Sequence, residues 1–228
     1  MFEPSVTRLK WNPDTSCFRV APGRKPFRWI RAGLGDANMA MAPAQIKGGS
    51  KVSWAEEPSE RDRLVLREQL GRPLRGEIKV VSRCPFGKPR VIGTPPLLPD
   101  GTPFPTLFWL TCPMLVKAVS RLESGDLRER LRRKLEDGDF AWRLEKAERE
   151  YAEERERWAG SKAQREVVRE LFADRMGIGG TVRGGMKCLH AHLAHYLAGF
   201  DNPVGEEVFQ ELPEVSCEGS CAPFLKER

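Results

Sequence analysis

The sequence predicts an α+β domain in which several helices cover a small antiparallel sheet of about three strands. Two β-rich segments, 76–84 and 90–94, flank a turn that contains proline and glycine, which is typical of a hairpin. The apolar run 106–112 stops at a proline and indicates a third, buried strand. From Met114 onward, apolar residues recur at helical spacing.

The expected helices follow from start and stop signals as well as from periodicity. Ser59 and Asp62 have the spacing of a capping box, and Gly71 followed by Pro73 ends the helix that they open. Asp139 is expected to cap a long, charged helix that ends at Gly160. The other helices are expected at 114–122, 127–135, 163–175, 184–199 and 204–212.

The charge of the chain is concentrated at one end. The whole chain carries a formal net charge of +6, and residues 1–51 hold nine Lys or Arg against three Asp or Glu. The remaining residues are therefore balanced. A nucleic-acid partner would require a basic face on the folded part, so the charge of the folded part does not support one.

The chain divides into three regions. Residues 1–58 are basic, show no sustained periodicity and are expected to be disordered. Residues 59–212 are expected to form a single domain, and 213–228 a flexible tail. The stretch 46–52 can be encoded as a ribosome-binding sequence followed by a GTG codon. We therefore consider the hypothesis that translation begins near Val52 and that the preceding residues are a mis-called start.

The expected cellular compartment determines how the six cysteines are interpreted. The sequence has no run of eighteen apolar residues, and its first residues lack the pattern of a secretory signal. The expected location is the cytoplasm, with no membrane partner. Because thiols stay reduced there, the six cysteines are interpreted as buried side chains or metal ligands before disulfides.

The three histidines of the chain fall within six residues, 190–195, next to Cys188. If this stretch is helical from the glycines onward, Cys188, His192 and His195 share one face because they are spaced i, i+4 and i+7. Thiol and imidazole groups suit zinc or iron. The stretch is therefore a candidate half of a metal site.

Two further cysteines lie where ligands would be well placed. Cys84 and Cys112 each end an expected strand, and each is followed by a proline that stiffens the turn. Strand ends of one sheet can lie close together, so these thiols could join Cys188, with His195 or His192 as a fourth ligand. Such a set would hold zinc or, as an alternative, an iron–sulfur cluster. The opposing interpretation is that both cysteines are small core residues.

The glycine-rich approach to the histidine helix suggests an anion site. Backbone amides at a helix start can hold an anion, and Arg183 and Lys187 would add positive charge. Arg83 is a third candidate for this role. The opposing interpretation is that the glycines only form a turn before the helix.

Several motifs together resemble a bacterial family of uncharacterised proteins, domain-of-unknown-function family 501. The resemblance covers about residues 60–210 and rests on the segments 67–73, 83–89, 98–107, 110–113, 187–190 and 202–205, with His195. It implies a bacterial cytoplasmic protein and brings no established activity. In the family, His192 is usually replaced by an apolar residue, and the position of Cys112 holds Cys or His. The resemblance therefore favours the ligand set of Cys84, Cys112, Cys188 and His195, with His190 as the competing fourth ligand.

Three functions are compatible with these features. The first is a metal-binding protein, with zinc in a structural or regulatory role. The second is a metal-dependent enzyme acting on a phosphorylated or other anionic substrate, in which the metal activates water. The third is a partner-binding module without a metal, which would use the charged helix around Trp142 and Trp158.

Overall fold

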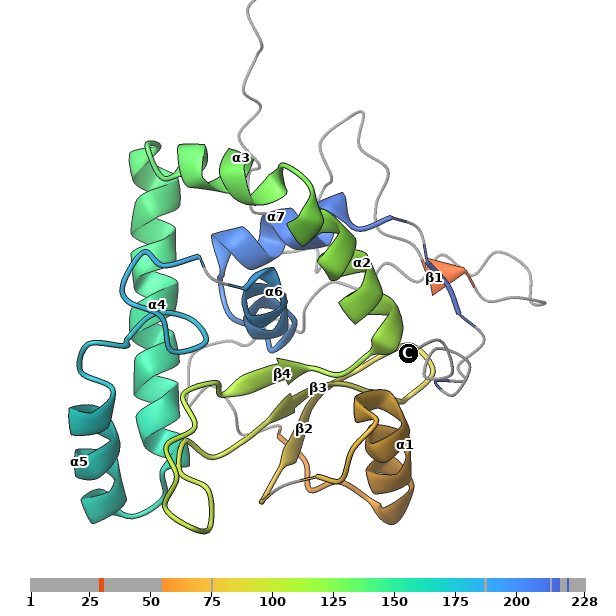
Figure 1. Cartoon of the computed structure of the whole chain (residues 1–228), viewed down its shortest axis with the longest axis vertical. Coiled ribbons are helices and arrows are strands. Elements are labelled where there is room, and N and C mark those ends of the chain that lie inside the picture. Colours follow the sequence, from red (N-terminus) through yellow and green to blue (C-terminus); the bar gives the residue numbers. More distant parts are fainter. Residues whose placement is uncertain are drawn as a thin grey trace, which may run out of the picture.

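The computed structural model describes residues 29–30, 55–74, 76–186, 188–213, 215–217 and 221. Within these residues, seven helices surround a three-stranded antiparallel sheet with the strand order β2-β3-β4 (Figure 1). The α+β class expected from the sequence is therefore confirmed. Figure 1 shows α1 on one side of the sheet and α6 and α7 on the other, with the long α4 along one flank.

The expected hairpin forms from β2 (Lys79–Arg83) and β3 (Pro89–Gly93), and β4 (Phe108–Leu110) pairs with the other edge of β3. The register places Val80 opposite Ile92 and Val91 opposite Leu110. Gly87 closes the turn with a φ of 71°, which a residue with a Cβ rarely adopts. The third strand ends earlier than expected because Cys112 already occupies the N-cap position of the following helix.

The described residues include 55–58, which precede the helix cap at Ser59. Glu56 and Val80 exchange backbone hydrogen bonds of 2.9 and 2.8 Å, which satisfy polar groups on the outer edge of β2. A short parallel pair also joins β1 (Trp29–Ile30) to β5 (Val215–Ser216). The remainder of the segment 1–54, including the proposed start at Val52, lies outside the described residues.

Helix α1 (Glu60–Leu70) forms as the sequence predicts. Ser59 and Asp62 make a reciprocal capping box, and Gly71 ends the helix with a φ of 63°. Its buried Leu66 packs with Ile78 and Ile92 in a small cluster on one face of the sheet.

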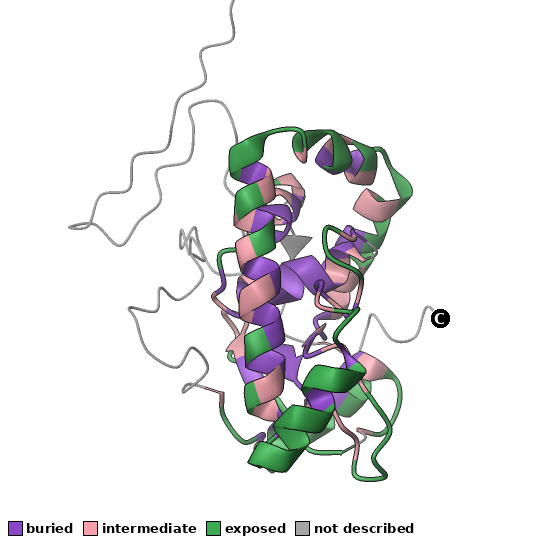
Figure 2. Cartoon of the chain, turned by 90° about the vertical axis from the view of Figure 1, so that its left-hand side faces the viewer, coloured by how far each residue is buried: buried purple, intermediate pink, exposed green. Residues whose placement is uncertain are grey.

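The helical half of the chain consists of α2 (Pro113–Ser124), α3 (Leu127–Lys134), α4 (Gly138–Trp158) and α5 (Lys162–Leu171). The cap of α4 is Asp137 instead of the expected Asp139, because the Asp137 side chain accepts a hydrogen bond from the Asp139 amide. In Figure 2, α4 alternates between a buried inner stripe and an exposed outer face. This helix therefore covers the core along its whole length.

Helices α6 (Leu189–Leu197) and α7 (Pro203–Glu211) lie against β4, α2 and each other at the centre of the molecule. Gly205 permits their close approach. A Cβ at this position would overlap the His192 carbonyl oxygen and would lie 2.6 Å from the Tyr196 Cβ. The histidine helix is therefore one of the most enclosed elements of the fold.

Candidate metal centre

The glycine-rich loop before α6 delivers Cys188 in an extended conformation. Glu148, which is buried on α4, accepts hydrogen bonds from the Gly184 amide at 2.9 and 3.1 Å and fixes the loop. Cys188 has φ −142° and ψ 112°, and the helix begins only at Leu189. The expected face shared by Cys188, His192 and His195 does not exist, because Cys188 precedes the helix.

The extended conformation brings Cys188 to His190. The Cys188 Sγ lies 3.7 Å from the His190 Nδ1, and the same nitrogen lies 3.3 Å from the Glu123 Oε2. Glu123 comes from the last turn of α2, far from the other two in sequence. Among the described residues, these three form the one group of His, Cys, Asp or Glu whose ligand atoms all lie within 4.8 Å of one another. Each is partly buried.

The hydrogen bonds of His190 determine which nitrogen faces the group. Its Nε2 lies 3.1 Å from the carbonyl oxygen of Val116 and 3.3 Å from the Ser120 Oγ. A carbonyl oxygen only accepts, so Nε2 carries the proton in the neutral ring and donates it to Val116. The Nδ1 lone pair is then directed at Cys188 and Glu123. Metal-bound histidines are typically held by such a bond from the other ring nitrogen to a carbonyl.

Glu123 has a second task at the start of α6. Its Oε1 accepts a hydrogen bond of 2.5 Å from the Leu189 amide, and Cys188 provides no side-chain cap of its own. A carboxylate also complements the positive end of the helix dipole. Because Oε1 is occupied in this way, the carboxylate is fixed with Oε2 directed at His190.

Cys188 and His190 shift each other's pKa. Burial opposes ionisation of Cys188, but the contact with His190, a hydrogen bond from the Ala191 amide and the positive charge of protonated His190 together lower the pKa of the thiol below its usual value. Burial also opposes protonation of His190, but its contact with Cys188 and the charges of Cys188 and Glu123 raise its pKa. The site therefore favours the thiolate, which is the form that binds metal ions.

The other two histidines are core residues. His192 and His195 are buried and share the side chain of Asn202, whose Oδ1 lies 3.3 Å from the His192 Nδ1. The Asn202 Nδ2 lies 3.1 Å from the His195 Nδ1. His195 also stacks on Phe200 with ring centroids 4.3 Å apart. Burial lowers the pKa of His192 to about 4, so this ring is neutral at pH 7.

Cys84 and Cys112 do not join Cys188. Cys84 begins the turn between β2 and β3, where its amide donates to the Lys88 carbonyl oxygen at 2.8 Å. Cys112 is buried at the start of α2, whereas Glu123 lies at the opposite end of that helix. The structure therefore does not assemble the expected set of Cys84, Cys112, Cys188 and His195, and only the competing ligand His190 meets Cys188.

Two of the three expected anion-binding residues, Arg83 and Arg183, lie among the described residues. Arg83 is engaged by carboxylates, at 2.8 Å from the Asp62 Oδ1 and 2.9 Å from the Glu56 Oε2. Arg183 is exposed in the glycine-rich loop, where its Nη2 lies 3.3 Å from the Met176 Sδ. Lys187 lies outside the described residues.

Glu123 was missed by the sequence interpretation, although a local signal was present. A carboxylate in the last turn of a helix faces the negative end of the helix dipole and is unfavourable there unless something else holds it. In the structure, the start of α6 and His190 provide that compensation.

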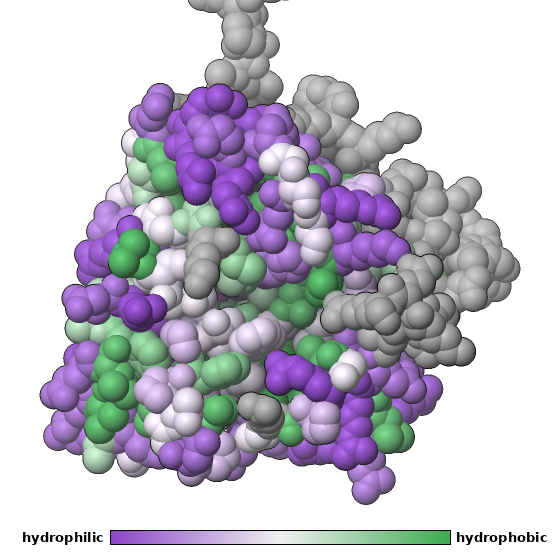
Figure 3. Space-filling model, viewed as in Figure 1, coloured by the Kyte–Doolittle hydropathy of each residue, from purple (hydrophilic) through white to green (hydrophobic). Residues whose placement is uncertain are grey.

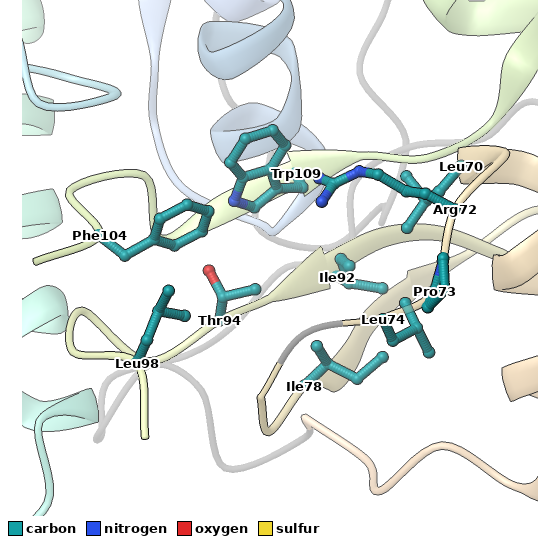
Figure 4. A pocket seen from close by; sticks show the side chains of 10 residues that line it. All are labelled: Leu70, Arg72, Pro73, Leu74, Ile78, Ile92, Thr94, Leu98, Phe104 and Trp109. Carbon is teal, nitrogen blue, oxygen red and sulfur yellow. The ribbon is translucent and has the colours of Figure 1, made fainter. Parts of the chain in front are cut away.

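Two hollows lie outside the three-residue group. An apolar pocket of about 90 Å³ lies beside the sheet, where Phe104 stacks on Trp109 with centroids 5.4 Å apart (Figure 4). An open, more polar hollow of about 550 Å³ is lined by Arg132, Arg175 and the loop up to Met186. The second hollow lies next to the candidate site along the chain, because Met186 precedes Cys188 by two residues.

A family model described as a protein of unknown function (DUF501) matches residues 80–210, more than half of the chain. The chain therefore belongs to this family, as its motifs indicated. The matched region contains Glu123, Cys188 and His190. No curated protein and no solved structure matches the chain. Among the described helices, none combines the length and the apolar character that crossing a membrane requires.

Proposed function

We propose that this protein binds one divalent ion of the zinc class through Glu123, Cys188 and His190. The observation that carries the proposal is the convergence of the three side chains. A thiol, an imidazole nitrogen and a carboxylate oxygen from distant parts of the chain have ligand atoms within 4.8 Å of one another. These three donor types are the usual protein ligands of zinc.

The supporting contacts favour binding over a simple polar cluster. Because the Nε2 of His190 donates its proton to the Val116 carbonyl oxygen, the lone pair of Nδ1 is available to a metal ion. The Leu189 amide fixes Glu123, and the lowered pKa of Cys188 favours the anionic ligand. Little reorganisation is therefore needed to form three bonds of about 2.0–2.3 Å to an ion.

We infer a regulatory role for this ion. The His190 and Glu123 side chains are 22% and 20% exposed, so solvent reaches the site and an ion can exchange. Bound there, the ion would link the end of α2 to the start of α6. Its removal would loosen the junction between these helices, while the core around His195 would keep the domain folded.

The test is a zinc titration of the reduced full-length chain after chelation, with the stoichiometry read by native mass spectrometry. We expect C188S and H190A each to remove one bound ion, and E123Q to weaken its binding by at least about tenfold. E129Q is the matched control, because Glu129 is an exposed carboxylate of the neighbouring helix. Unchanged affinity in C188S and H190A would refute the proposal.

A metal-dependent enzyme acting on a phosphorylated or other anionic substrate is the second candidate. Three protein ligands leave one position of a tetrahedral ion for water, which is the arrangement of catalytic zinc. The polar hollow supplies Arg132 and Arg175 for an anion. The guanidinium of Arg175 has no hydrogen bond or ion pair within the described part of the chain. Figure 3 shows a hydrophilic surface over α3, the helix that carries Arg132.

This second function predicts a chemical activity that the regulatory role does not. The zinc-loaded chain would hydrolyse a generic phosphate ester, and R175A would raise KM with less effect on kcat. R121A provides the matched control, because Arg121 lies on α2 and does not line the hollow. Absence of hydrolysis by fully loaded protein would leave the regulatory role as the function of the site.

A further inference from the structure

The apolar pocket of about 90 Å³ beside the sheet has no part in the function proposed above. Its walls come from the end of α1 and the loop that follows it, from β3 and β4, and from the proline-rich loop 95–105 (Figure 4). It shares no residue with the group of Glu123, Cys188 and His190. The pocket is therefore a separate feature of the fold whose chemistry can be read from its own walls.

The two loops beside the pocket are held in place by close contacts. In the proline-rich loop, the Phe104 amide donates to the Pro96 carbonyl oxygen at 2.7 Å. Gly76, in the loop after α1, has a φ of 69°, and a Cβ at this position would lie 3.3 Å from the Pro99 Cδ. The two loops therefore approach each other closely. Because the pocket is formed without a ligand, little ordering of the chain opposes binding there.

Two aromatic rings form one wall of the pocket. Phe104 and Trp109 are half-buried and lie almost parallel, with an interplanar angle of 9°. The indole N–H of Trp109 donates to the Thr106 carbonyl oxygen at 3.0 Å, and the Thr94 hydroxyl donates to the same oxygen at 2.9 Å. Because the wall satisfies both of these donors itself, the interior of the pocket suits an apolar group.

One charged side chain belongs to this otherwise apolar lining. Arg72 is exposed, and in Figure 4 its side chain points toward Trp109. Its guanidinium has no hydrogen bond or ion pair within the described part of the chain, and none of the lining residues carries a carboxylate. A cation just after a helix complements the helix dipole, but that role requires neither a hollow nor an aromatic wall. The pocket thus combines an apolar interior with one free positive charge.

We propose that the pocket binds a small monocarboxylic acid whose single aromatic ring or branched alkyl group enters the cavity. An internal cavity of about 150 Å³ holds benzene, so this smaller pocket admits one such group and leaves the carboxylate at the surface. The carboxylate lies at Arg72, because a guanidinium can donate two parallel hydrogen bonds to it. One cation neutralises one negative charge, which favours a carboxylate over a phosphate dianion.

The experiment is a titration of the full-length chain with phenylacetate, followed by ligand-observed NMR. Phenylacetamide has the same shape without the charge, and we expect it to bind at least about tenfold more weakly. R72Q should reduce the affinity for phenylacetate by about tenfold and leave the affinity for phenylacetamide unchanged. R67Q is the matched control, because Arg67 is exposed on α1 and does not line the pocket.

Three further variants locate the ligand. F104A removes one ring of the wall, and we expect it to weaken the binding of both compounds, because each loses contact with that ring. Phenylacetate should change the tryptophan fluorescence of the wild-type chain and leave that of W109F unchanged. C188S should bind phenylacetate as the wild-type chain does, so this proposal and the metal site fail independently.

Three results would overturn the pocket as a carboxylate site. The first is equal affinity of the wild-type chain for phenylacetate and phenylacetamide. The second is an R72Q variant that binds phenylacetate as tightly as R67Q does, because the charge at the pocket would then contribute nothing. The third is the absence of any binding to the wild-type chain at about 10 mM phenylacetate.

Discussion

The buried side chain of Asn202 makes hydrogen bonds to His192, His195 and the backbone amide of Gly205. Replacing Asn202 therefore tests how much these bonds stabilise the core. Its Oδ1 caps α7 by accepting from the Gly205 amide at 2.9 Å and also accepts from the His192 Nδ1. Its Nδ2 donates to the His195 Nδ1. The side chain is fully buried, so water cannot replace these bonds. Asn202→Ala removes all three at once.

The expected cost follows from the groups left unpaired. Loss of an N-cap costs about 1 kcal/mol, and each buried polar nitrogen left unpaired costs about 1–3 kcal/mol. We therefore expect Asn202→Ala, which removes the cap and leaves two ring nitrogens unpaired, to lower the free energy of unfolding by about 3–7 kcal/mol. This is a large share of the 5–15 kcal/mol that is typical of a folded domain.

Urea denaturation followed by tryptophan fluorescence measures this loss. Asn202→Ser is the matched variant, because serine restores the cap without reaching both histidines, and we expect it to recover about 1 kcal/mol. A loss below about 1 kcal/mol in Asn202→Ala, with an unchanged denaturant slope, would show that the histidines do not depend on Asn202.

Three further predictions concern other parts of the molecule. Asp62→Asn should cost about 2–4 kcal/mol, because the carboxylate closes a capping box and pairs with an arginine. The arginine lowers the pKa of Asp62, so the difference from wild type in urea denaturation should be complete above about pH 4 and shrink as the pH falls below it. Gly205→Ala should cost about 1–3 kcal/mol, because its Cβ overlaps the His192 carbonyl oxygen, whereas Gly138→Ala meets no atom within 4 Å and should cost little in the same assay. Zinc affinity at the proposed metal site, measured by competition with a chelator, should fall as the pH drops through the raised pKa of His190, and an affinity independent of pH would exclude this ligand.

The two tryptophans of the charged helix α4 have different environments, which the sequence does not indicate. Trp142 of α4 is 55% exposed, and the Lys146 ammonium group lies 5.7 Å from its ring centroid. Trp158 instead packs edge-on to Phe108 at 6.2 Å. The two tryptophans expected to form one partner-binding surface therefore have different environments, and the partner-binding function stays a prediction without a specific contact to support it.

The sequence by itself determined the elements whose causes are local. The capping box at Ser59, the turn at Gly87 and the apolar stripes of the helices each depend on neighbours within a few residues, so the α+β class could be predicted. It also indicated Cys188 and the histidines as candidate site residues, because the three histidines fall within six residues next to this cysteine.

Only the tertiary structure decided which of these residues meet. Whether Cys188 lies inside or before α6 changes the direction of its thiol completely, and that boundary depends on Glu123 of another helix, which caps the Leu189 amide. His195 and His190 are the same residue type on the same helix. His195 is nevertheless enclosed by Phe200 and Tyr151, whereas His190 faces the carboxylate of Glu123. The physical reason is that local propensities act between near neighbours, whereas a binding site depends on the packing of segments far apart in the chain.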